Sequence, residues 1–551
     1  MISNSPQEYL TLLFWTPHFC GKPKTSKFSL LLSLIILTIG PTISSSFTFP
    51  SSSTMKFDLK HTYNNIHHDS SSLSQSVSKV HDETQDKKHL ILVGGGHAHI
   101  QVIKALNTKA RPSNLDVTLI DLQENVFYSG MVPGCVSNLY TPSQTQISLS
   151  PLAKWAGINF ICEKVIDANF IEQTLSLSNG NQISFDCVSF DIGSTTRGTD
   201  TTKGVLQYTI PTRPISKLVS TFDELHLSNA VKPEPIVVVG GGPAGIELAM
   251  AIRARSNPKQ SIELINAGQD LIPSESSKCR QALLQILKEK NILIKNQCVV
   301  QQIDDTHIHI SDLDQSELTL LPYSHCLWAT GAAPHTSFVN QIKSNPNSIA
   351  FDSTGWIRVN NKLQSVSHPN VFAAGDCATI EGLKHGKRSP PKAGVYAVRS
   401  GPILINNLVK YTCGDDDQKD EKSIPQSYIE YEPQDDFLKL LMCGDGKALG
   451  FRFGIPIYGK WVWQLKDHID QMFMDLFDEK NLPDIHQETN LDMSQYDAVT
   501  KKRPTPLPAI DAATLLKRTD DDVDFHRAWD VIRDMMDDET YKLEVLDYFS
   551  D

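Results

Sequence analysis

Two glycine-rich segments, each preceded by an apolar run, are the parts of this sequence best suited to chemistry. The first is Gly94-Gly95-Gly96-His97-Ala98-His99, after His89–Val93, and the second is Gly240-Gly241-Gly242-Pro243-Ala244-Gly245, after Ile236–Val239. Glycines permit a tight turn and a close backbone approach to a pyrophosphate, while the following helix N-terminus supplies N–H donors. Both segments therefore predict dinucleotide-binding loops, the second through Gly240, Gly242 and Gly245.

The two loops differ in their details. His99 replaces the third glycine of GxGxxG in the first loop, so we expect the helix to lie slightly further from the strand. Asp121 ends the next apolar run, where an acid binds ribose hydroxyls. The corresponding run of the second loop ends at Asn266, which favours neither NAD nor NADP. The choice between NADH and NADPH therefore stays open.

A third signature lies in residues 370–378, where an apolar strand runs into Gly375-Asp376. A strand followed by Gly-Asp is how flavoproteins with two dinucleotide-binding domains hold the ribityl chain and phosphate of the flavin. Trp328–Pro334, which contains Gly331, and Asp191–Ser194, which contains Gly193, read as the crossovers between the domains, with Asp191 where alanine is usual. Together these signatures predict that the chain binds FAD and either NADH or NADPH.

The order of these motifs predicts an α/β fold. We expect two Rossmann-like dinucleotide-binding domains, an FAD domain interrupted by an NAD(P) domain, followed by a small α+β C-terminal domain. The predicted boundaries are 88–215 and 334–412 for the FAD domain, 216–333 for the NAD(P) domain, 425–480 for the C-terminal domain and 481–551 for a helical tail of unassigned role.

Composition excludes several other classes of protein. With 551 residues, 40% hydrophobic and 21% charged, the chain is neither a polytopic membrane protein nor disordered throughout. A net charge of −12 argues against nucleic-acid binding, which needs a basic face. The ten cysteines form no CxxC or CxxxxC pair, so we predict neither a metal site nor a vicinal redox disulfide.

Residues 1–87 read as a presequence rather than as part of the fold. Three lysines precede the apolar run Phe28–Ile39, which is too short to span a bilayer, and small residues follow it, as in a signal peptide. The Ser-rich stretch from Ser51 to Val80 resembles a transit peptide, with Phe47 and Phe49 near the join. This bipartite pattern predicts import into a plastid. The alternatives are the secretory pathway, another organelle or a disordered extension.

Three segments carry a resemblance to a known family: Gly94–His99, Phe127–Gly134 and Gly444–Phe477. Over roughly residues 88–477 the chain resembles the pyridine nucleotide-disulfide oxidoreductase superfamily, in particular flavoproteins related to type II NADH dehydrogenases. It is most similar to the flavoprotein found fused ahead of selenide, water dikinase, although the kinase itself is missing. The resemblance implies that Pro133 lines the isoalloxazine, Val165 belongs to the FAD site, Glu247 approaches the nicotinamide and Lys392 lies near the flavin pyrimidine edge.

These residues have simpler interpretations too: Glu247 as an acid in a first helical turn, and Lys392 as a surface lysine. Cys135 stands alone where disulfide reductases carry two cysteines, and we expect it to be a small buried side chain. The predicted reaction is therefore hydride transfer from NAD(P)H to FAD, followed by electron transfer to a quinone or another small acceptor. The alternatives are a sulfide:quinone-type flavoenzyme and a slow regulatory flavoprotein that acts through a partner.

The segment after Gly459 predicts an amphipathic helix. Leu465, Ile469, Met472, Phe473 and Leu476 form one apolar stripe. The stripe suits core packing, or else a membrane-facing or quinone-access surface. On the predicted polar face three aspartates, at 467, 470 and 475, outnumber Lys466, which disfavours anionic lipid. Peripheral membrane contact therefore stays possible, and the sequence predicts no oligomeric state.

Overall fold

The computed structural model describes residues 87–109, 111–225, 227, 231–312, 318–414, 427–434, 437–452 and 454–483. The predicted presequence, except for residue 87, and the predicted tail from residue 484 lie outside these residues. In the part that is described, the search for a helix both long and apolar enough to cross a bilayer finds none.

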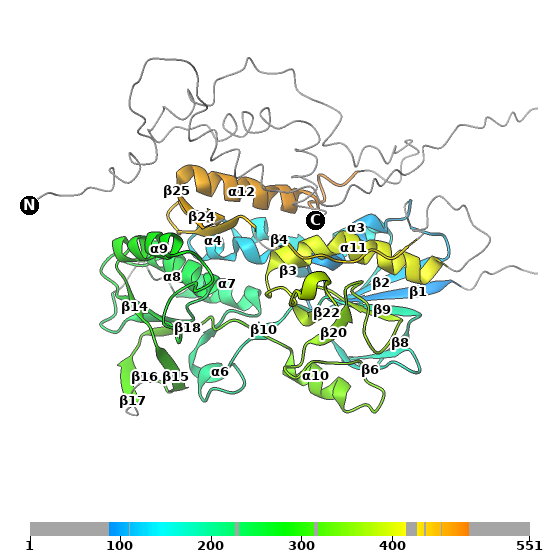
Figure 1. Ribbon diagram of the computed structural model, residues 1–551, viewed down its shortest axis with the longest axis horizontal. Helices are drawn as coiled ribbons and strands as arrows, with labels where there is room; N and C mark the ends of the chain where they lie inside the picture. Colours follow the sequence, from blue (N-terminus) through cyan, green and yellow to red (C-terminus); the bar gives the residue numbers. More distant parts are fainter. Residues whose placement is uncertain are drawn as a thin grey trace, which may run out of the picture.

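A five-stranded parallel sheet in the order β21-β9-β1-β2-β5 forms the centre of the first unit (Figure 1). Its strands are β1 (Lys88–Val93), β2 (Leu115–Asp121), β5 (Asn159–Cys162), β9 (Cys187–Phe190) and β21 (Val371–Ala373). Leu90 and Leu92 pack on one face, and Ile91 and Val93 pack on the other. Both faces are covered, which explains why β1 reads as a nearly continuous apolar run.

Helices cover one face of this sheet and smaller elements cover the other. On the first face lie α3 (His97–Ala105), α5 (Leu149–Ala156) and α11 (Gly394–Cys413), with α3 and α11 side by side in Figure 1. On the other lie β6 (Val165–Asn169), β7 (Thr174–Leu177), β8 (Gln182–Ser184), α10 (Thr336–Lys343) and β20 (Ile357–Asn360). The remaining elements of this unit are β3 (Asn125–Phe127), η1 (Ser129–Met131), α4 (Val132–Val136), η2 (Pro142–Thr145), β4 (Gln146–Ser148), η3 (Gly375–Cys377), β22 (Ala378–Glu381) and η4 (Lys384–Gly386).

A second parallel sheet, in the order β11-β18-β12-β13-β14, forms the second unit. Its strands are β11 (Ile210–Pro211), β12 (Ile236–Val239), β13 (Ile262–Ile265), β14 (Ile292–Lys295) and β18 (His325–Trp328). The unit also contains α6 (Val205–Tyr208), α7 (Ile215–Glu224), α8 (Pro243–Arg255), α9 (Ser277–Glu289) and an antiparallel meander of β15 (Cys298–Ile303), β16 (His307–Asp312) and β17 (Leu318–Pro322). Because β11 pairs with β18, this unit begins ahead of the predicted boundary at residue 216.

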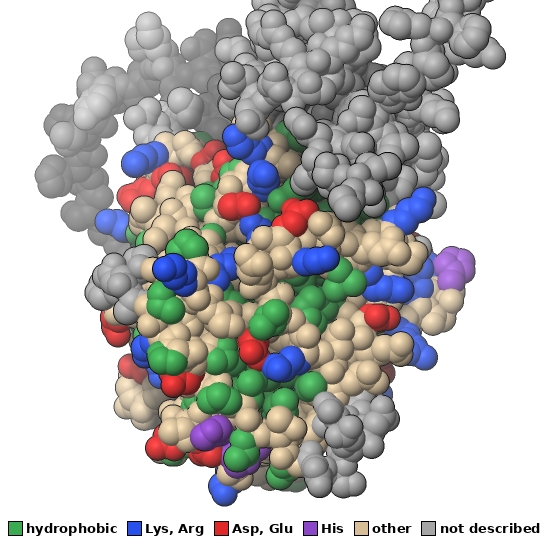
Figure 2. All heavy atoms as spheres, turned by 90° about the vertical axis from the view of Figure 1, so that its left-hand side faces the viewer, with side chains coloured by type: hydrophobic (Ala, Val, Ile, Leu, Met, Phe, Trp, Pro, Cys, Tyr) green, Lys and Arg blue, Asp and Glu red, His purple; other side chains and the backbone are tan. Residues whose placement is uncertain are grey.

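The outer face of the second unit mixes both signs of charge with scattered apolar side chains (Figure 2). Leu318 and Leu320 on the edge strand β17 are 56% and 53% exposed.

Two short strands join the units. β10 (Thr195–Thr196) pairs antiparallel with β19 (Ala332–Ala333), so the chain leaves the first unit and returns to it at one place. The predicted crossovers Asp191–Ser194 and Trp328–Pro334 run into these two strands. The α/β architecture with Rossmann-like parallel sheets is confirmed.

The C-terminal part is a three-stranded antiparallel sheet with one helix. It contains β23 (Lys439–Met442), β24 (Ala448–Arg452), β25 (Ile455–Gly459) and α12 (Lys460–Asp475). α12 lies on the same side of the molecule as α3 and α11 (Figure 1). The predicted polar face was wrong in part, because Lys466 and Asp470 are buried. Of the predicted apolar stripe, Phe473 is buried and Leu465, Ile469, Met472 and Leu476 are half-buried.

Candidate functional site

The first glycine loop connects β1 to α3 as the sequence predicts. Gly94 has φ 93°, a left-handed conformation that favours glycine, and a Cβ there would collide with the backbone of Asp191. Gly96 is the N-cap of α3, and His97, Ala98 and His99 form its first turn. The loop therefore brings the N-terminus of α3 to the carboxyl end of the sheet, where dinucleotides bind.

His99, which replaces the third glycine, is fully buried. Its Nδ1 lies 2.7 Å from the carbonyl oxygen of Gly94, and its Nε2 lies 2.8 Å from Ser189 Oγ on β9. Burial lowers the pKa of His99 to about 4, so the imidazole is neutral at physiological pH. The ring thus ties the start of α3 to two neighbouring strands, a role that the sequence did not reveal.

Asp121 lies at the end of β2, where an acid of this fold meets ribose. Its Oδ2 accepts a hydrogen bond from the Gly95 N–H at 2.6 Å, and its Oδ1 accepts one from the Gln123 N–H at 2.7 Å. Burial raises the pKa of the carboxyl, while these two N–H groups act in the opposite direction. The carboxylate therefore braces the glycine loop directly.

Asp191, at the end of β9, occupies an unexpected place. Its Oδ2 accepts hydrogen bonds from the N–H groups of Ala98 at 2.9 Å and His99 at 3.2 Å. A Cβ on Gly96 or on Gly375 would collide with its carboxylate. The carboxylate therefore lies between the two glycine segments that the sequence assigns to the flavin. The sequence marked this position only as an aspartate in place of alanine.

Gly375 and Asp376 follow β21 in the same region. Gly375 has φ 66°, and Asp376 Oδ2 accepts hydrogen bonds from Ser194 Oγ at 2.9 Å and from Arg213 Nη2 at 3.3 Å. Arg213 also bonds Ser194 itself. Sequence reasoning missed Arg213, because nothing in its neighbourhood resembles a motif. Gly193 and Gly331 also have positive φ and open space beside the Cα, so this region has room for a ligand.

Lys392 lines a small hollow together with Gly375, Asp376 and Tyr396. Its Nζ contacts the carbonyl oxygen of Ala378 and lies 4.5 Å from the centre of the Trp356 ring. Burial lowers its pKa, although Cys377 and Asp376 act to raise it. Lys392 is therefore a half-buried cation beside the Gly-Asp turn.

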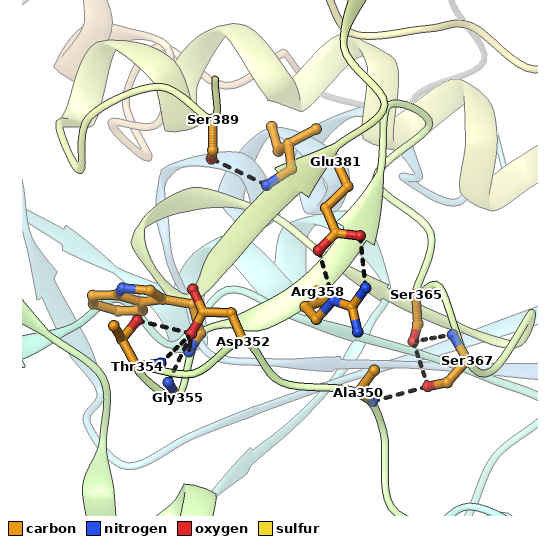
Figure 3. Close-up of polar contacts among 11 residues, drawn as sticks. Ala350, Asp352, Thr354, Gly355, Arg358, Ser365, Ser367, Glu381 and Ser389 are labelled. Atoms are coloured by element: carbon orange, nitrogen blue, oxygen red, sulfur yellow. Dashed lines mark hydrogen bonds and ion pairs between the residues drawn. The ribbon is translucent and has the colours of Figure 1, made fainter. Parts of the chain in front are cut away.

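The loop that leads to Lys392 is joined to β22 through Ser389 (Figure 3). Ser389 Oγ accepts a hydrogen bond from the Ile380 N–H at 3.0 Å. On the adjoining pair of strands, the Arg358 guanidinium donates to both oxygens of Glu381, at 2.6 and 2.9 Å. A bidentate pair of this kind fixes geometry as well as adding energy. The Arg358–Glu381 pair thus holds β20 and β22 together, and Lys392 contacts the first residue of β22, Ala378.

The segment expected beneath the flavin forms η1 and α4. Pro133 and Cys135 are both buried on α4. Cys135 Sγ lies 3.2 Å from Thr145 Oγ1, and burial raises the pKa of its thiol. All cysteines of the described residues are free thiols. Val165, at the start of β6, is buried in the same apolar cluster as Ile91 and Val93.

Glu247 takes part in a cluster formed by three parts of the chain. On α8 it accepts a hydrogen bond from the Met442 N–H of β23 at 2.8 Å. Lys466 of α12 donates to the Gly130 carbonyl oxygen at 3.1 Å and to Asp470 Oδ2 at 2.8 Å. Burial raises the pKa of Glu247 to about 7, and Lys466 opposes the rise. Burial also acts to lower the pKa of Lys466, but Asp470 and Glu247 outweigh it and raise that pKa.

The second glycine loop has the expected close contacts. Gly240 has φ 132°, and a Cβ there would collide with the Ala329 carbonyl oxygen; a Cβ on Gly245 would collide with the carbonyl oxygen of Gly240. Gly242, the N-cap of α8, is exposed with open space beside it. Asn266 is buried, and its amide donates to Gly268, Asp270 and Asn296, so its side chain is committed to the protein.

Comparison with known protein families matches residues 88–401 to pyridine nucleotide-disulphide oxidoreductases. The chain belongs to this family. It is 24% identical to apoptosis-inducing factor homolog B of Dictyostelium discoideum, over 64% of this chain and 89% of that protein. It is 22% identical to alternative NAD(P)H-ubiquinone oxidoreductase C1, chloroplastic/mitochondrial, of Arabidopsis thaliana, over 66% of this chain and 75% of that protein. Among solved structures, NDH2 from Plasmodium falciparum in complex with NADH shares the fold with a TM-score of 0.59 and 18% identity, over 72% of this chain and 100% of that one.

Proposed function

We propose that this chain is an FAD-dependent oxidoreductase that accepts hydride from NADH or NADPH and passes electrons to a quinone or another small acceptor. The observation that carries the proposal is the presence of two strand–glycine–helix openings in separate parallel sheets, linked by β10 and β19. The name of the Arabidopsis relative, an NAD(P)H-ubiquinone oxidoreductase, supports this class of reaction.

FAD would bind the first unit, at a helix terminus that it would share with the Asp191 carboxylate. The N-terminus of α3, Asp121 at the end of β2 and the Gly375-Asp376 turn converge there, and the space beside Gly193 and Gly331 is open. Bound FAD would supply the acceptor for a hydride and the donor for onward electrons. Lys392 would place a cation near the flavin, and Pro133 would pack against it.

NADH or NADPH would bind the second loop. The exposed N-terminus of α8 offers backbone N–H groups and the positive end of a helix dipole to a pyrophosphate. Because Asn266 is held by internal hydrogen bonds, it selects neither a ribose hydroxyl nor a 2′-phosphate. We therefore propose that the nucleotide is NADH or NADPH, without choosing between the two.

The acceptor is proposed to be diffusible because Cys135 is a lone buried thiol rather than one of a redox pair. Reduction of a quinone consumes protons as well as electrons. Glu247, whose pKa of about 7 lies near physiological pH, could hold or release a proton in the cluster with Lys466 and Asp470. Because Glu247 is bonded to the Met442 N–H and lies near Lys466, we propose a role in proton transfer for it in place of a contact with the nicotinamide.

Two finer assignments accompany the proposal. The Phe127–Gly134 and Gly444–Phe477 segments favour kinship with the flavoprotein that is fused to selenide, water dikinase in other chains.

The bipartite pattern of residues 1–87 favours a plastid location, and the name of the Arabidopsis relative is compatible with it. A fluorescent fusion to residues 1–87 would test the location. Fluorescence outside plastids would contradict it.

The decisive experiment is an anaerobic titration of the purified full chain, following the visible flavin band. We expect bleaching within seconds on adding NADH or NADPH, and recovery of the band on adding a short-chain quinone. A yellow protein that neither nucleotide bleaches would contradict the proposal and favour a slow regulatory flavoprotein. Bleaching by sulfide alone would favour a sulfide:quinone-type enzyme.

A further inference from the structure

Asp191 lies at the helix terminus where a dinucleotide-binding fold places its pyrophosphate. Its Oδ2 is held by the N–H groups of Ala98 and His99 in the first turn of α3. The backbone carbonyl of Asp191 also accepts from the Gly96 N–H at 3.2 Å. A buried carboxylate thus uses donors that a phosphate would otherwise meet, and a charged carboxylate there would repel a phosphate.

The two oxygens of this carboxylate differ. Oδ2 accepts two hydrogen bonds, whereas Oδ1 receives none from the described residues. Both oxygens lie against the position where Gly96 lacks a side chain, but only Oδ1 also lies against that of Gly375. A proton on Asp191 would therefore reside on Oδ1. In that position it would be a donor on the side of the carboxyl that faces the Gly-Asp turn.

We propose that Asp191 shares the N-terminus of α3 with the FAD pyrophosphate and takes up a proton when FAD binds. The inference rests on the proposed FAD site. Proton uptake turns a charge that would repel the phosphate into a hydrogen-bond donor, and it leaves Oδ2 in place as the acceptor for α3. Binding of FAD is then linked to pH.

The surrounding charges favour this uptake. Burial raises the pKa of Asp191 to about 7 against the N–H groups of Ala98 and His99, which act to lower it. Asp376 on η3 and Asp121 at the end of β2 face Asp191, and both act in the same direction as burial. Cys377 on η3 also lies close, and its own thiol pKa is raised to about 12, so it stays neutral. On α3, His99 is neutral and bonded to Gly94 and Ser189. Arg213 is paired with Asp376.

The charge of Asp191 determines how the affinity for FAD depends on pH. The two phosphate charges of FAD would raise the pKa of Asp191 above its value in the free protein. Below pH 7 both forms are protonated, and affinity does not depend on this group. Above pH 7 the free protein is ionised, so the dissociation constant for FAD rises by about tenfold per pH unit until the pKa of the complex is reached.

The test is titration of deflavinated full-length protein with FAD between pH 6 and 9, by quenching of flavin fluorescence. Calorimetry in buffers of different ionisation enthalpy counts the protons taken up. We expect uptake approaching one proton near pH 8, and none for Asp191→Asn, whose affinity should exceed that of the wild type at pH 8 and vary little with pH. Asp186→Asn, on the segment before the opposite end of β9, is the matched control and should behave as wild type.

Each outcome is informative. A wild-type chain that binds FAD without proton uptake, or an Asp191→Asn variant that keeps it, overturns the inference while leaving the proposed cofactor intact. Failure of the wild type to bind FAD at any pH overturns the proposed function itself. If Asp191→Asn does not fold, the infrared C=O band of a protonated carboxyl, gained by the wild type on adding FAD, decides the same question.

Discussion

The Nζ of Lys466 on α12 donates a hydrogen bond to the carbonyl oxygen of Gly130 at 3.1 Å, which ties the C-terminal sheet and helix to the segment that leads into α4. The same ammonium pairs with Asp470 at 2.8 Å, and Glu247 of the second unit contributes to its charge environment. One buried cation therefore links all three parts of the chain.

Replacing this cation should be costly. Lys466→Met leaves Asp470 buried without its partner, and loss of one member of a buried ion pair destabilises a protein by about 3–5 kcal/mol. Urea unfolding of the purified variant would measure the loss. The exposed Lys278→Met on α9 is the control, expected within about 0.5 kcal/mol of wild type. The double variant Lys466→Met/Asp470→Asn should recover part of the loss; no recovery would argue against the pair.

Glu247 should make stability depend on pH. Its folded-state pKa, about 7, lies above the value near 4.5 expected for the unfolded chain, so its contribution to the free energy of unfolding falls as pH rises between these values. Glu247→Gln keeps an acceptor for the Met442 N–H but carries no charge. We expect the variant to be more stable than wild type at pH 8, by a margin that shrinks toward pH 5, as measured by urea unfolding. An equal margin at both pH values would refute this assignment.

His99→Gly, which restores the usual third glycine, should weaken the protein rather than improve it. The variant loses the hydrogen bonds to Gly94 and Ser189 and leaves a cavity beside β9, a combined cost of about 2–4 kcal/mol. Thermal unfolding without added FAD gives the measurement. His99→Asn, a smaller side chain that keeps a polar group, should recover part of the loss. An unchanged melting temperature for the glycine variant would show that the ring adds nothing.

Lys392 should tune the flavin of the proposed enzyme. Removing a cation beside an anionic reduced flavin lowers the midpoint potential, and on the order of 20–30 mV corresponds to about 1–1.4 kcal/mol for two electrons. We expect this shift for Lys392→Met in a spectroelectrochemical titration. Arg388→Met, an exposed cation on the same loop, should leave the potential unchanged. Equal shifts in both variants would indicate a general charge effect instead.

The local features of the fold could be predicted from the sequence. The loops at Gly94 and Gly240 could be predicted because their backbone adopts conformations or makes contacts that only glycine tolerates. Glycines at adjacent positions of the sequence therefore indicate these loops. The crossovers at Asp191–Ser194 and Trp328–Pro334 follow from the same logic. The order of these segments along the chain was enough to indicate two parallel sheets.

What could not be predicted depends on residues far apart in sequence. The contact between Asp191 and α3 exists because β9 lies beside β1 in the sheet, an adjacency that no local pattern encodes. Lys466 and Asp470 were assigned to an exposed polar face because charged residues seldom lie buried unless they are paired. Their partners, Gly130 and Glu247, come from other parts of the chain. Arg213 was missed for the same reason.

The pairing of β10 with β19 brings Thr196 opposite Ala332. The whole second unit is thus an insertion whose first and last residues are neighbours. The strands β9 and β21, which precede and follow the insertion, pair with each other in the first sheet. A short linker between these two points would close the first unit on itself. The second unit could then be exchanged for that of another family member, and the exchanged unit would have to supply a cation in place of Arg213, which pairs with Asp376 of the first unit.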